Sequence, residues 1–356
     1  LAPIEHGRND TVRAMFERAH AILDRANALV ARLRRVLPFL SLATGIAGAV
    51  MMNRSPGRAW IVVVAAVVGF VVLVVANVVR IEGSTLAHKG VRYAIALSNQ
   101  VAIQQALLFP LPFYLRSAQI VVRTDTSFAL HAPEPAHAAF FVVYAGALVV
   151  AMWDPLFTRA MTSTTAAFAL QAFATFAGLD MVLPVLGVSN AASLYLAGIA
   201  TAIAVPLALV VRGPTAPKWR VRAIAIGGAI GGAVVVVVAA RLAAPFIPPA
   251  PLELVSVAIG TGVADHEIVG ASDALAAGTL YCHSAIRAPA GLHDSLLHVW
   301  SKNGVRLPPI PLQVRGGRDA GFRTWSTQSI DDAGDVRCSV ETASGQVLGS
   351  ARATVH

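Results

Sequence analysis

Charged residues are scarce in this chain. Asp, Glu, Lys and Arg together make up 13% of its 356 residues, whereas hydrophobic residues make up 56%. Soluble globular domains carry about 25% charged residues, so this composition excludes a chain that is soluble throughout. Lysine is nearly absent, with only Lys89, Lys218 and Lys302, and arginine therefore carries most of the positive charge.

The chain also lacks the short motifs that identify common reactions. It contains no nucleophile elbow, no phosphate-binding loop and no paired-carboxylate motif, and its histidines do not have the spacing of metal ligands. We therefore predict no catalytic residue, no metal and no cofactor. Enzymatic activity is left open, with a non-enzymatic protein favoured.

Cysteine is limited to two residues, Cys282 and Cys338, and each lies inside a predicted strand. If the two strands are neighbours in an oxidising compartment, a disulfide would close a loop of about 56 residues. The alternative is a pair of buried free thiols.

Long apolar stretches fill the chain from residue 36 to residue 247. A bilayer-spanning helix needs about 20 apolar residues. We therefore predict a polytopic α-helical membrane domain over residues 36–247, preceded by a cytoplasmic amphipathic helix over 1–35. Seven transmembrane helices are predicted, at residues 36–52, 59–79, 93–115, 138–153, 165–184, 191–211 and 223–247.

The cations beside these stretches are sorted to one side. Fifteen Arg and Lys residues flank the spans on the side of the N-terminus, and four lie on the other side. The positive-inside rule then places the N-terminus in the cytoplasm of a bacterial inner membrane and, with seven spans, the C-terminal domain in the periplasm. An even number of spans would reverse that last step. Because the net charge of +9 lies beside the bilayer, we expect the lipid bilayer as its partner and no nucleic acid.

The N-terminal segment has a wide apolar stripe at helical spacing. Val12, Met15, Ala19, Ile22 and Ala26 belong to this stripe. Such a helix lies at a lipid interface or docks onto another subunit.

Polar residues inside the predicted spans are costly and therefore informative. The third span carries Asn99, Gln100, Gln104 and Gln105, which indicates hydrogen bonds between helices or, as the alternative, a polar cavity. Asp180, near the end of the fifth span, is a candidate for handling protons or ions, although a position at the membrane interface is the simpler interpretation.

The last predicted span carries two pairs of glycines, and the two members of each pair are four residues apart. Gly227, Gly228, Gly231 and Gly232 form two small-xxx-small pairs, which allow two helix backbones to approach closely. The neighbouring helix can belong to the same chain or to a second copy.

From residue 252 to residue 356 the apolar residues alternate with period two. Strands are predicted at 252–259, 264–271, 278–286, 295–301, 305–314, 321–329, 334–342 and 346–354, with Asn303-Gly304 and Ser344-Gly345 as hairpin turns. Short strands at this spacing favour an all-β, immunoglobulin-like sandwich, with a compact barrel as the alternative.

Two strands of this domain each carry a tryptophan beside a basic or titratable residue. His298 and Trp300 lie on one face of one strand, and Arg323 and Trp325 on one face of another. If the strands pair, the four residues would form a cluster suited to a glycan or a peptide. As structural residues, the same tryptophans would be the core of a small sandwich.

The C-terminal domain resembles a small domain of unknown function found in many proteobacterial and myxobacterial membrane proteins. The matching elements are His298-Val-Trp300, Lys302-Asn303-Gly304, Arg323-Thr-Trp-Ser326 and residues 334–341. The preceding part resembles its usual companion, an uncharacterised polytopic family, through segments such as Arg54-Ser-Pro-Gly-Arg58 and Trp153-Asp-Pro155. Valine stands at Val336, where the family tends to have tryptophan. The resemblance implies an architecture and no activity.

Two functions follow as hypotheses. The first is a membrane-anchored accessory protein whose periplasmic sandwich binds a protein partner or an envelope polymer, as a subunit of a larger complex or as a homo-oligomer. The second is a small transporter or lipid-modifying enzyme that uses the polar third span and Asp180.

Overall fold

The computed structural model describes the chain from Asn99 to His356, except for residues 124–127, 131–134, 213–217, 290–291 and 319. It also describes five separate residues in a helical conformation, Val36, Phe39, Leu42, Ala43 and Ala47. The predicted N-terminal amphipathic helix and the second predicted span lie outside the described residues, as does most of the first.

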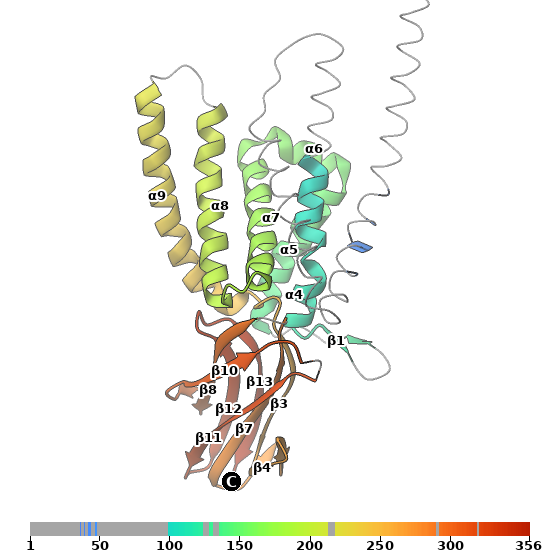
Figure 1. Cartoon of the computed structure of the whole chain (residues 1–356), viewed down its shortest axis with the longest axis vertical. Helices are drawn as coiled ribbons and strands as arrows, with labels where there is room; N and C mark the ends of the chain where they lie inside the picture. Colours follow the sequence, from blue (N-terminus) through green and yellow to red (C-terminus); the bar gives the residue numbers. More distant parts are fainter. Residues whose placement is uncertain are drawn as a thin grey trace, which may run out of the picture.

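Helices occupy one end of the molecule and strands the other (Figure 1). Residues 99–108 are helical. The helices that follow are α4 (Leu111–Ser117), η2 (Pro135–His137), α5 (Ala138–Met152), α6 (Asp154–Thr162), α7 (Thr164–Val185), α8 (Asn190–Arg212), α9 (Lys218–Ala243) and η3 (Ala244–Phe246). A small hairpin of β1 (Val121–Arg123) and β2 (Phe128–Leu130) lies beside α4.

Two described helical segments are long and apolar enough to cross a bilayer. They are Pro135–Met152 and Thr165–Val185, with mean hydropathies of 1.8 and 1.6. A shorter apolar helix covers Ile230–Phe246. The predicted number of seven spans is therefore not supported by the part of the chain that the structure describes.

The third predicted span is interrupted. Its helix stops at Leu108, turns at Phe109 and Pro110, and resumes as the seven-residue α4. Pro110 and Pro112 lack the backbone N–H that a continuous helix requires, and this is the physical reason why residues 93–115 do not form one uninterrupted helix.

Aromatic rings fill the centre of the helical part. Tyr114, Phe140, Tyr144 and Phe173 pack with ring centroids 5.0–6.1 Å apart. Tilted and edge-on arrangements at this distance are favourable for aromatic pairs. Because these rings come from α4, α5 and α7, their packing fixes the three helices relative to one another.

The predicted all-β region is confirmed, and most predicted strands are found within two residues of their expected ends. The strands are β3 (Glu253–Gly260), β4 (Gly262–Ala264), β5 (Glu267–Val269), β6 (Ala274–Leu275), β7 (Gly278–Arg287), β8 (His293–Lys302), β9 (Val305–Arg306), β10 (Ile310–Arg315), β11 (Phe322–Ile330), β12 (Gly334–Thr342) and β13 (Val347–Val355). The segment predicted as one strand over 305–314 is two short strands, because Pro308 and Pro309 cannot donate to a ladder.

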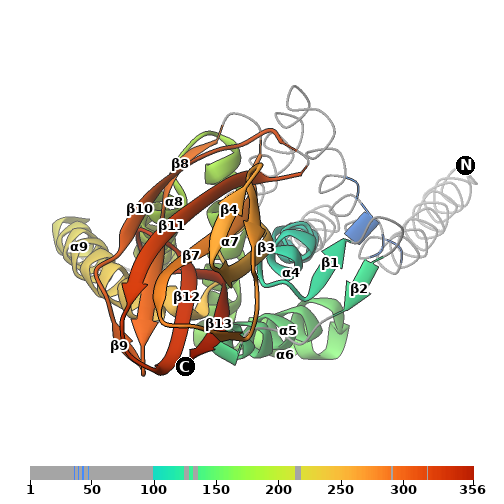
Figure 2. The ribbon, with the colours of Figure 1, turned by 90° about the horizontal axis from the view of Figure 1, so that it is seen from below.

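These strands form two principal sheets. One has the order β10-β8-β12-β13-β6, with β9 paired to β8, and the other has the order β11-β7-β3. Side chains from both sheets meet in two buried clusters, one around Leu254, Leu296 and Val340 and the other around Trp300 and the two cysteines. The sheets therefore pack face to face as a sandwich, which Figure 2 shows from below.

Among the described residues, side chains make four hydrogen-bonded contacts between the sandwich and the helical part. Gln119 donates to the carbonyl of Leu254 (3.1 Å), Arg241 to that of Ser344 (3.3 Å) and Gln346 to that of Ile247 (3.3 Å). In the fourth contact, the backbone and side-chain amides of Asn190 donate to Asp294. The helical part and the sandwich are thus held together by side-chain hydrogen bonds as well as by the covalent connection of the backbone.

Candidate functional site

Cys282 of β7 and Cys338 of β12 form a disulfide that joins the two sheets. Both residues are fully buried, and Trp300 is the direct cross-strand partner of Cys338. The imidazole of His298 lies close to both sulfur atoms, with the possible ligand atoms within 4.8 Å of one another. In the disulfide, neither sulfur is a thiolate, so only the imidazole retains a metal-binding atom.

A polar network beside the disulfide crosses the sandwich. The ring nitrogens of His298 lie 2.9 Å from the Ser284 hydroxyl and 2.8 Å from the Ser326 hydroxyl, and Trp300 Nε1 donates to Ser326 at 3.0 Å. Ser326 can therefore give its one proton to His298 Nδ1, leaving Nε2–H to donate to Ser284. In this arrangement every ring nitrogen has a partner.

The environment of His298 keeps its imidazole neutral. Burial, together with a smaller effect of the nearby His283, lowers the pKa of His298 from 6.5 to about 4. Burial likewise lowers the pKa of His283, against the opposing effect of its bond to the His266 carbonyl. The His298 side chain has 0% exposure, so a substrate cannot reach it. We conclude that His298 and its serines fix the packing of the two sheets.

The four residues predicted as a binding cluster are not brought together. His298 and Trp300 lie in the core, on β8 of the larger sheet. Arg323 and Trp325 lie on the outer face of β11 in the smaller sheet, where Trp325 is 40% exposed. Trp300 is therefore a core residue, and the condition for the predicted cluster, that the two strands pair, is not met.

Trp325 instead faces the β4–β5 hairpin. Its ring lies 5.7 Å from that of His266, and Arg323 pairs with Glu267 of the same hairpin at 2.8 Å. Asp265 and His266, at the hairpin tip, both have positive φ, as a type I′ turn requires. These contacts hold the hairpin against β11.

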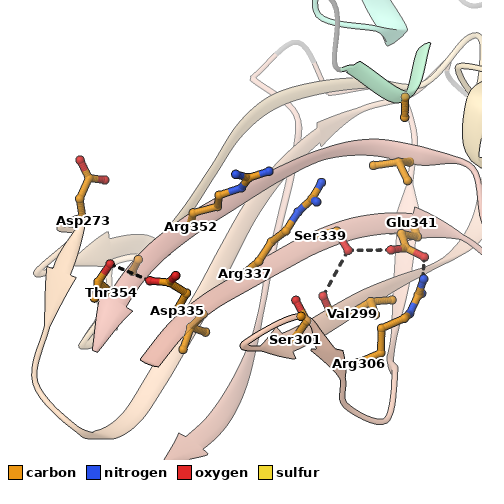
Figure 3. Close-up of a pocket in the computed structure, with 15 residues that line it drawn as sticks. Asp273, Val299, Ser301, Arg306, Asp335, Arg337, Ser339, Glu341, Arg352 and Thr354 are labelled. Atoms are coloured by element: carbon orange, nitrogen blue, oxygen red, sulfur yellow. Dashed lines mark hydrogen bonds and ion pairs between the residues drawn. The ribbon is translucent and has the colours of Figure 1, made fainter. Parts of the chain in front are cut away.

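The larger sheet carries a groove on its outer face, with a volume of about 780 Å³. The side chains that line it come from β8, β9, β12 and β13, from Asp273 before β6 and from Ala136 before α5. Figure 3 shows Arg306, Arg337, Arg352, Asp335 and Glu341 along the sheet surface. Ala136, which lines the groove, belongs to the apolar segment Pro135–Met152, one of the two that are long enough to cross a membrane. The groove therefore lies beside the start of that segment.

The arginines of the groove fall in one row across the sheet. Arg306 is the cross-strand partner of Ser301, Ser301 that of Arg337, and Arg337 that of Arg352. Residues at these positions alternate with buried ones such as Val336 and Cys338, so all of them point away from the core. Two of the arginines, Arg337 and Arg352, are therefore direct neighbours on adjacent strands.

Carboxylates lie on either side of this row. Glu341 is paired with Arg306 at 2.7 Å and also accepts from Ser339 at 2.7 Å. Asp335 accepts from Thr354 at 3.1 Å. The sequence analysis did not predict this surface. A signal for it is present, because polar residues occupy every second position of β12, at Asp335, Arg337, Ser339 and Glu341.

The polar residues of the third predicted span bond to other helices. Gln100 donates to the Ala151 carbonyl at 3.3 Å and to Asp154 at 2.9 Å, and Gln104 donates to the same carbonyl at 2.9 Å. Asn99 accepts from Gln171 at 3.4 Å. Gln105 is half-buried. These contacts are hydrogen bonds between helices, as the first of the two predictions for this span expects.

Asp180 is buried within the helices. Its side chain has 2% exposure and accepts from the Tyr114 hydroxyl at 3.0 Å and the Ser193 hydroxyl at 3.4 Å. Ser193 also donates to the backbone carbonyl of Asp180 at 2.7 Å. A carboxylate in this position is held by neutral donors from α4 and α8.

Only part of the predicted glycine face contacts a neighbour. A Cβ at Gly232 would lie 3.7 Å from the Ala202 carbonyl of α8, whereas one at Gly227 or Gly231 would meet no atom within 4 Å among the described residues. Gly228 is exposed. The close helix pair formed through these glycines is thus α8 with α9.

The fold and the groove define a protein that combines a helical region with a C-terminal β-sandwich. Residues 16–281 match the family described as Family of unknown function (DUF5924). This match covers most of the chain, so the protein belongs to that family. Residues 293–355 match Protein of unknown function (DUF2914). No curated protein matches the chain.

The two family matches divide the sandwich between them. The first ends inside β7, after β3, whereas the second begins at the start of β8. Because β3 and β7 form most of the smaller sheet, the sandwich requires segments from both matches.

Proposed function

We propose that this protein is a membrane-anchored interaction protein whose β-sandwich presents its groove to a protein partner or an envelope polymer. In this proposal the helices span a bacterial inner membrane, the N-terminus is cytoplasmic and the sandwich, of immunoglobulin-like kind, is periplasmic. The observation that carries the proposal is the groove of about 780 Å³ on the outer face of the larger sheet.

Three features support this function. The described chain contains two helical segments suited to a bilayer, and the groove lies beside the start of one of them. The two sheets are linked by a disulfide, which is typical of proteins in oxidising compartments. The buried polar network of His298 is closed to solvent, which argues for binding by the surface and against chemistry in the core.

Site-specific photo-crosslinking in native membranes tests the groove. A crosslinking residue at Ser301, inside the groove, should give a discrete crosslinked product. The same residue at Gln313, which is exposed on β10 outside the groove, should give none. Equal products from both positions, or none from either, would argue against the proposed surface.

Reporter fusions test the orientation separately. Alkaline phosphatase fused after His356 should be active. Green fluorescent protein fused at the same position should not fluoresce when it is exported to the periplasm in the same way. The opposite pattern would place the sandwich in the cytoplasm and remove the envelope as its site of action.

The buried carboxylate of Asp180 supports a second candidate function, a small transporter or a lipid-modifying enzyme. A carboxylate that accepts from hydroxyls inside a helical bundle is costly to keep there and is often functional. Asp180→Asn should then abolish transport or change the lipid profile of cells, with Gln104→Leu as a second variant on the neighbouring polar helix. Unchanged phenotypes would exclude this function.

A further inference from the structure

The two principal sheets have four outer edges. In the larger sheet they are β10 on one side and β13 with the short β6 on the other, and in the smaller sheet they are β11 and β3. The outer side of an edge strand carries N–H and C=O groups that have no ladder partner. Proteins usually block such an edge with proline, a bulge, a very short strand or a covering segment.

Three of the four edges are blocked in this way. Pro311 lies inside β10 and has no N–H to donate. A bulge interrupts β3 between Leu254 and Ser256, and Gln119 donates to the Leu254 carbonyl. Near its end β13 pairs with β6, and a Cβ at Gly349 would lie 2.6 Å from Leu254 and 3.1 Å from Gln119. None of these edges accepts a further strand along its whole length.

The fourth edge, β11, has none of these features. Its nine residues pair with β7 in one unbroken register and include no proline or lysine. Within the described part of the chain, β7 is its one ladder partner, and Figure 2 shows β7 between β11 and β3. Every second residue of β11 therefore directs its N–H and C=O away from β7, along an edge of about 30 Å.

The side chains of this edge do not call for a charged ligand. Trp325 is 40% exposed, and the neutral Thr327 and Ser329 are also exposed on the outer face of the strand. The one charged residue of β11, Arg323, is paired with Glu267 at 2.8 Å. The groups of the edge that a ligand can satisfy are therefore chiefly those of the backbone.

We propose that the open edge of β11 binds an extended segment of a protein partner, which adds to the smaller sheet as a fourth strand. Another polypeptide matches a row of alternating amide donors and carbonyl acceptors, whereas a polysaccharide has no groups at this regular spacing. One face of the added segment would lie beside Phe322 and Ile330, which pack into the sandwich, so its alternate residues should be apolar.

The geometry favours a different protein over a second copy of this chain. Figure 1 shows the strands extending from the helical part toward the far end of the sandwich. Two copies with their helices in one bilayer would be related by an axis along the bilayer normal, so their β11 strands would run parallel. Such an axis would place the core-facing side chains of one copy beside the exposed side chains of the other. The inference goes beyond the proposed function, because it names a second surface and a protein as its ligand.

Amide hydrogen exchange of the purified full-length chain in neutral detergent tests whether the edge is open. Measured residue by residue, alternate amides of β11 should exchange rapidly, and the amides between them, bonded to β7, should exchange slowly. Slow exchange along all of β11 at every protein concentration would mean that the chain covers its own edge. Slowing at high concentration alone would mean that a second copy covers it. Either result would overturn the inference.

A defined peptide then tests strand addition. The probe has the sequence of β7, Gly278–Arg287, with Cys282→Ser, because these residues already pair with β11 and keep their apolar side chains on the core side. It should slow exchange of the open β11 amides at least roughly tenfold and saturably.

Two further versions of the peptide carry N-methyl groups on one or the other alternate set of amides. Only the set that faces β11 is needed for the ladder, so one version should bind and the other should not. Binding of both or of neither, or no effect of the unmethylated peptide, would contradict strand addition.

Thr327→Lys is the diagnostic variant, because a lysine on an edge strand opposes the addition of a further strand. It should weaken the peptide roughly threefold to tenfold. Gln313→Lys, at an exposed position of β10, is the matched control and should bind the peptide as the wild type does. Equal affinities for the two variants would reject β11 as the binding edge.

Photo-crosslinking in native membranes connects the edge to the protein partner. A crosslinking residue at Thr327 should give a product with a different protein, and the peptide that binds should suppress this product while the peptide that does not bind should leave it. A product of two copies, or one that the binding peptide leaves unchanged, would overturn the inference. A Ser301 product that persists under the same competition would leave the proposed function of the groove intact. Loss of the Ser301 product alone would reject the groove and leave the β11 edge.

Discussion

Asp294, near the start of β8, accepts two hydrogen bonds from Asn190, the first residue of α8. The backbone N–H donates at 2.9 Å and the side-chain amide at 3.0 Å, both to Oδ2. Ser189, the residue before the helix, accepts from the N–H of Ala192 at 3.3 Å. A side chain of the sandwich thus satisfies an N–H at the helix start that has no partner within the helix, and its negative charge suits that end of the helix.

Removing this cap should weaken the attachment of the sandwich. Asp294→Ala takes away, at a buried position, the acceptor of both Asn190 donors and of the Ser295 N–H, and we expect the free energy of unfolding to fall by about 1–2 kcal/mol. Hydrogen exchange at the start of α8 should become faster. Gln313→Ala, which removes only an exposed bond to Ser295, is the control, and a loss as small as that of the control would show that the cap is unimportant.

The stability of the sandwich should depend on pH through His298. Its pKa is about 4 in the folded chain against 6.5 in the unfolded one, so the unfolded chain binds the proton more tightly. The free energy of unfolding should therefore fall as pH decreases from 6.5 to 4, with a slope of up to about 1.4 kcal/mol per pH unit, and His298 should contribute no slope above this window.

Denaturant unfolding between pH 4 and pH 8 measures this effect. His298→Gln should flatten the profile in the acid window relative to the wild type, while His356→Gln, at an exposed position, should not. Parallel profiles for the wild type and His298→Gln would show that His298 is not the group responsible.

The sequence predicted the strands well because their pattern is local. Residues 334–342 alternate between core and surface, and β12 has those bounds. Asn303 and Gly304, predicted as a hairpin turn, both have positive φ between β8 and β9. Alternation shows which residues share a face of a strand, as it predicted for His298 and Trp300, both of which are buried on β8.

Sheet membership and register could not be predicted in the same way. Trp300 and Trp325 carry the same local signal, but β8 and β11 belong to different sheets. The arginine row depends on β12 pairing with β8 on one side and β13 on the other, and β8 and β12 are not consecutive strands. Long-range pairing of this kind is set by tertiary packing, so neither the groove nor the separation of Trp300 from Trp325 followed from the sequence.

The disulfide should be a major source of stability for the sandwich. It joins residues 56 positions apart, and a loop of this length corresponds to about 4 kcal/mol in the chain-entropy account. The double variant Cys282→Ala, Cys338→Ala should lower the free energy of unfolding by this order. Wild-type protein treated with a reductant under denaturing conditions and then refolded should behave similarly. Unfolding curves that do not respond to reduction would show that the bond contributes little.

The boundary between the two family matches predicts what can fold alone. A fragment of residues 293–356 keeps the larger sheet almost entirely but loses β3 and β7, and with them Leu252, Leu254 and Ile286 of one core cluster. It also leaves β11 without β7, its hydrogen-bonded neighbour, and Cys338 without Cys282. We expect no cooperative unfolding transition for this fragment, because an isolated sheet exposes the face that the other sheet covers.

A longer fragment, residues 248–356, contains every strand of both sheets and both cysteines. It should show a cooperative transition by circular dichroism and dispersed amide resonances, and the addition of a thiol reductant should lower its midpoint. Cooperative folding of the 293–356 fragment would mean that the second family match is a complete domain and that β3 and β7 are accessory to it. Because the buried face of β12 packs against β7 through the disulfide and against Leu254 through Val340, we expect the longer fragment to be the smallest unit that folds.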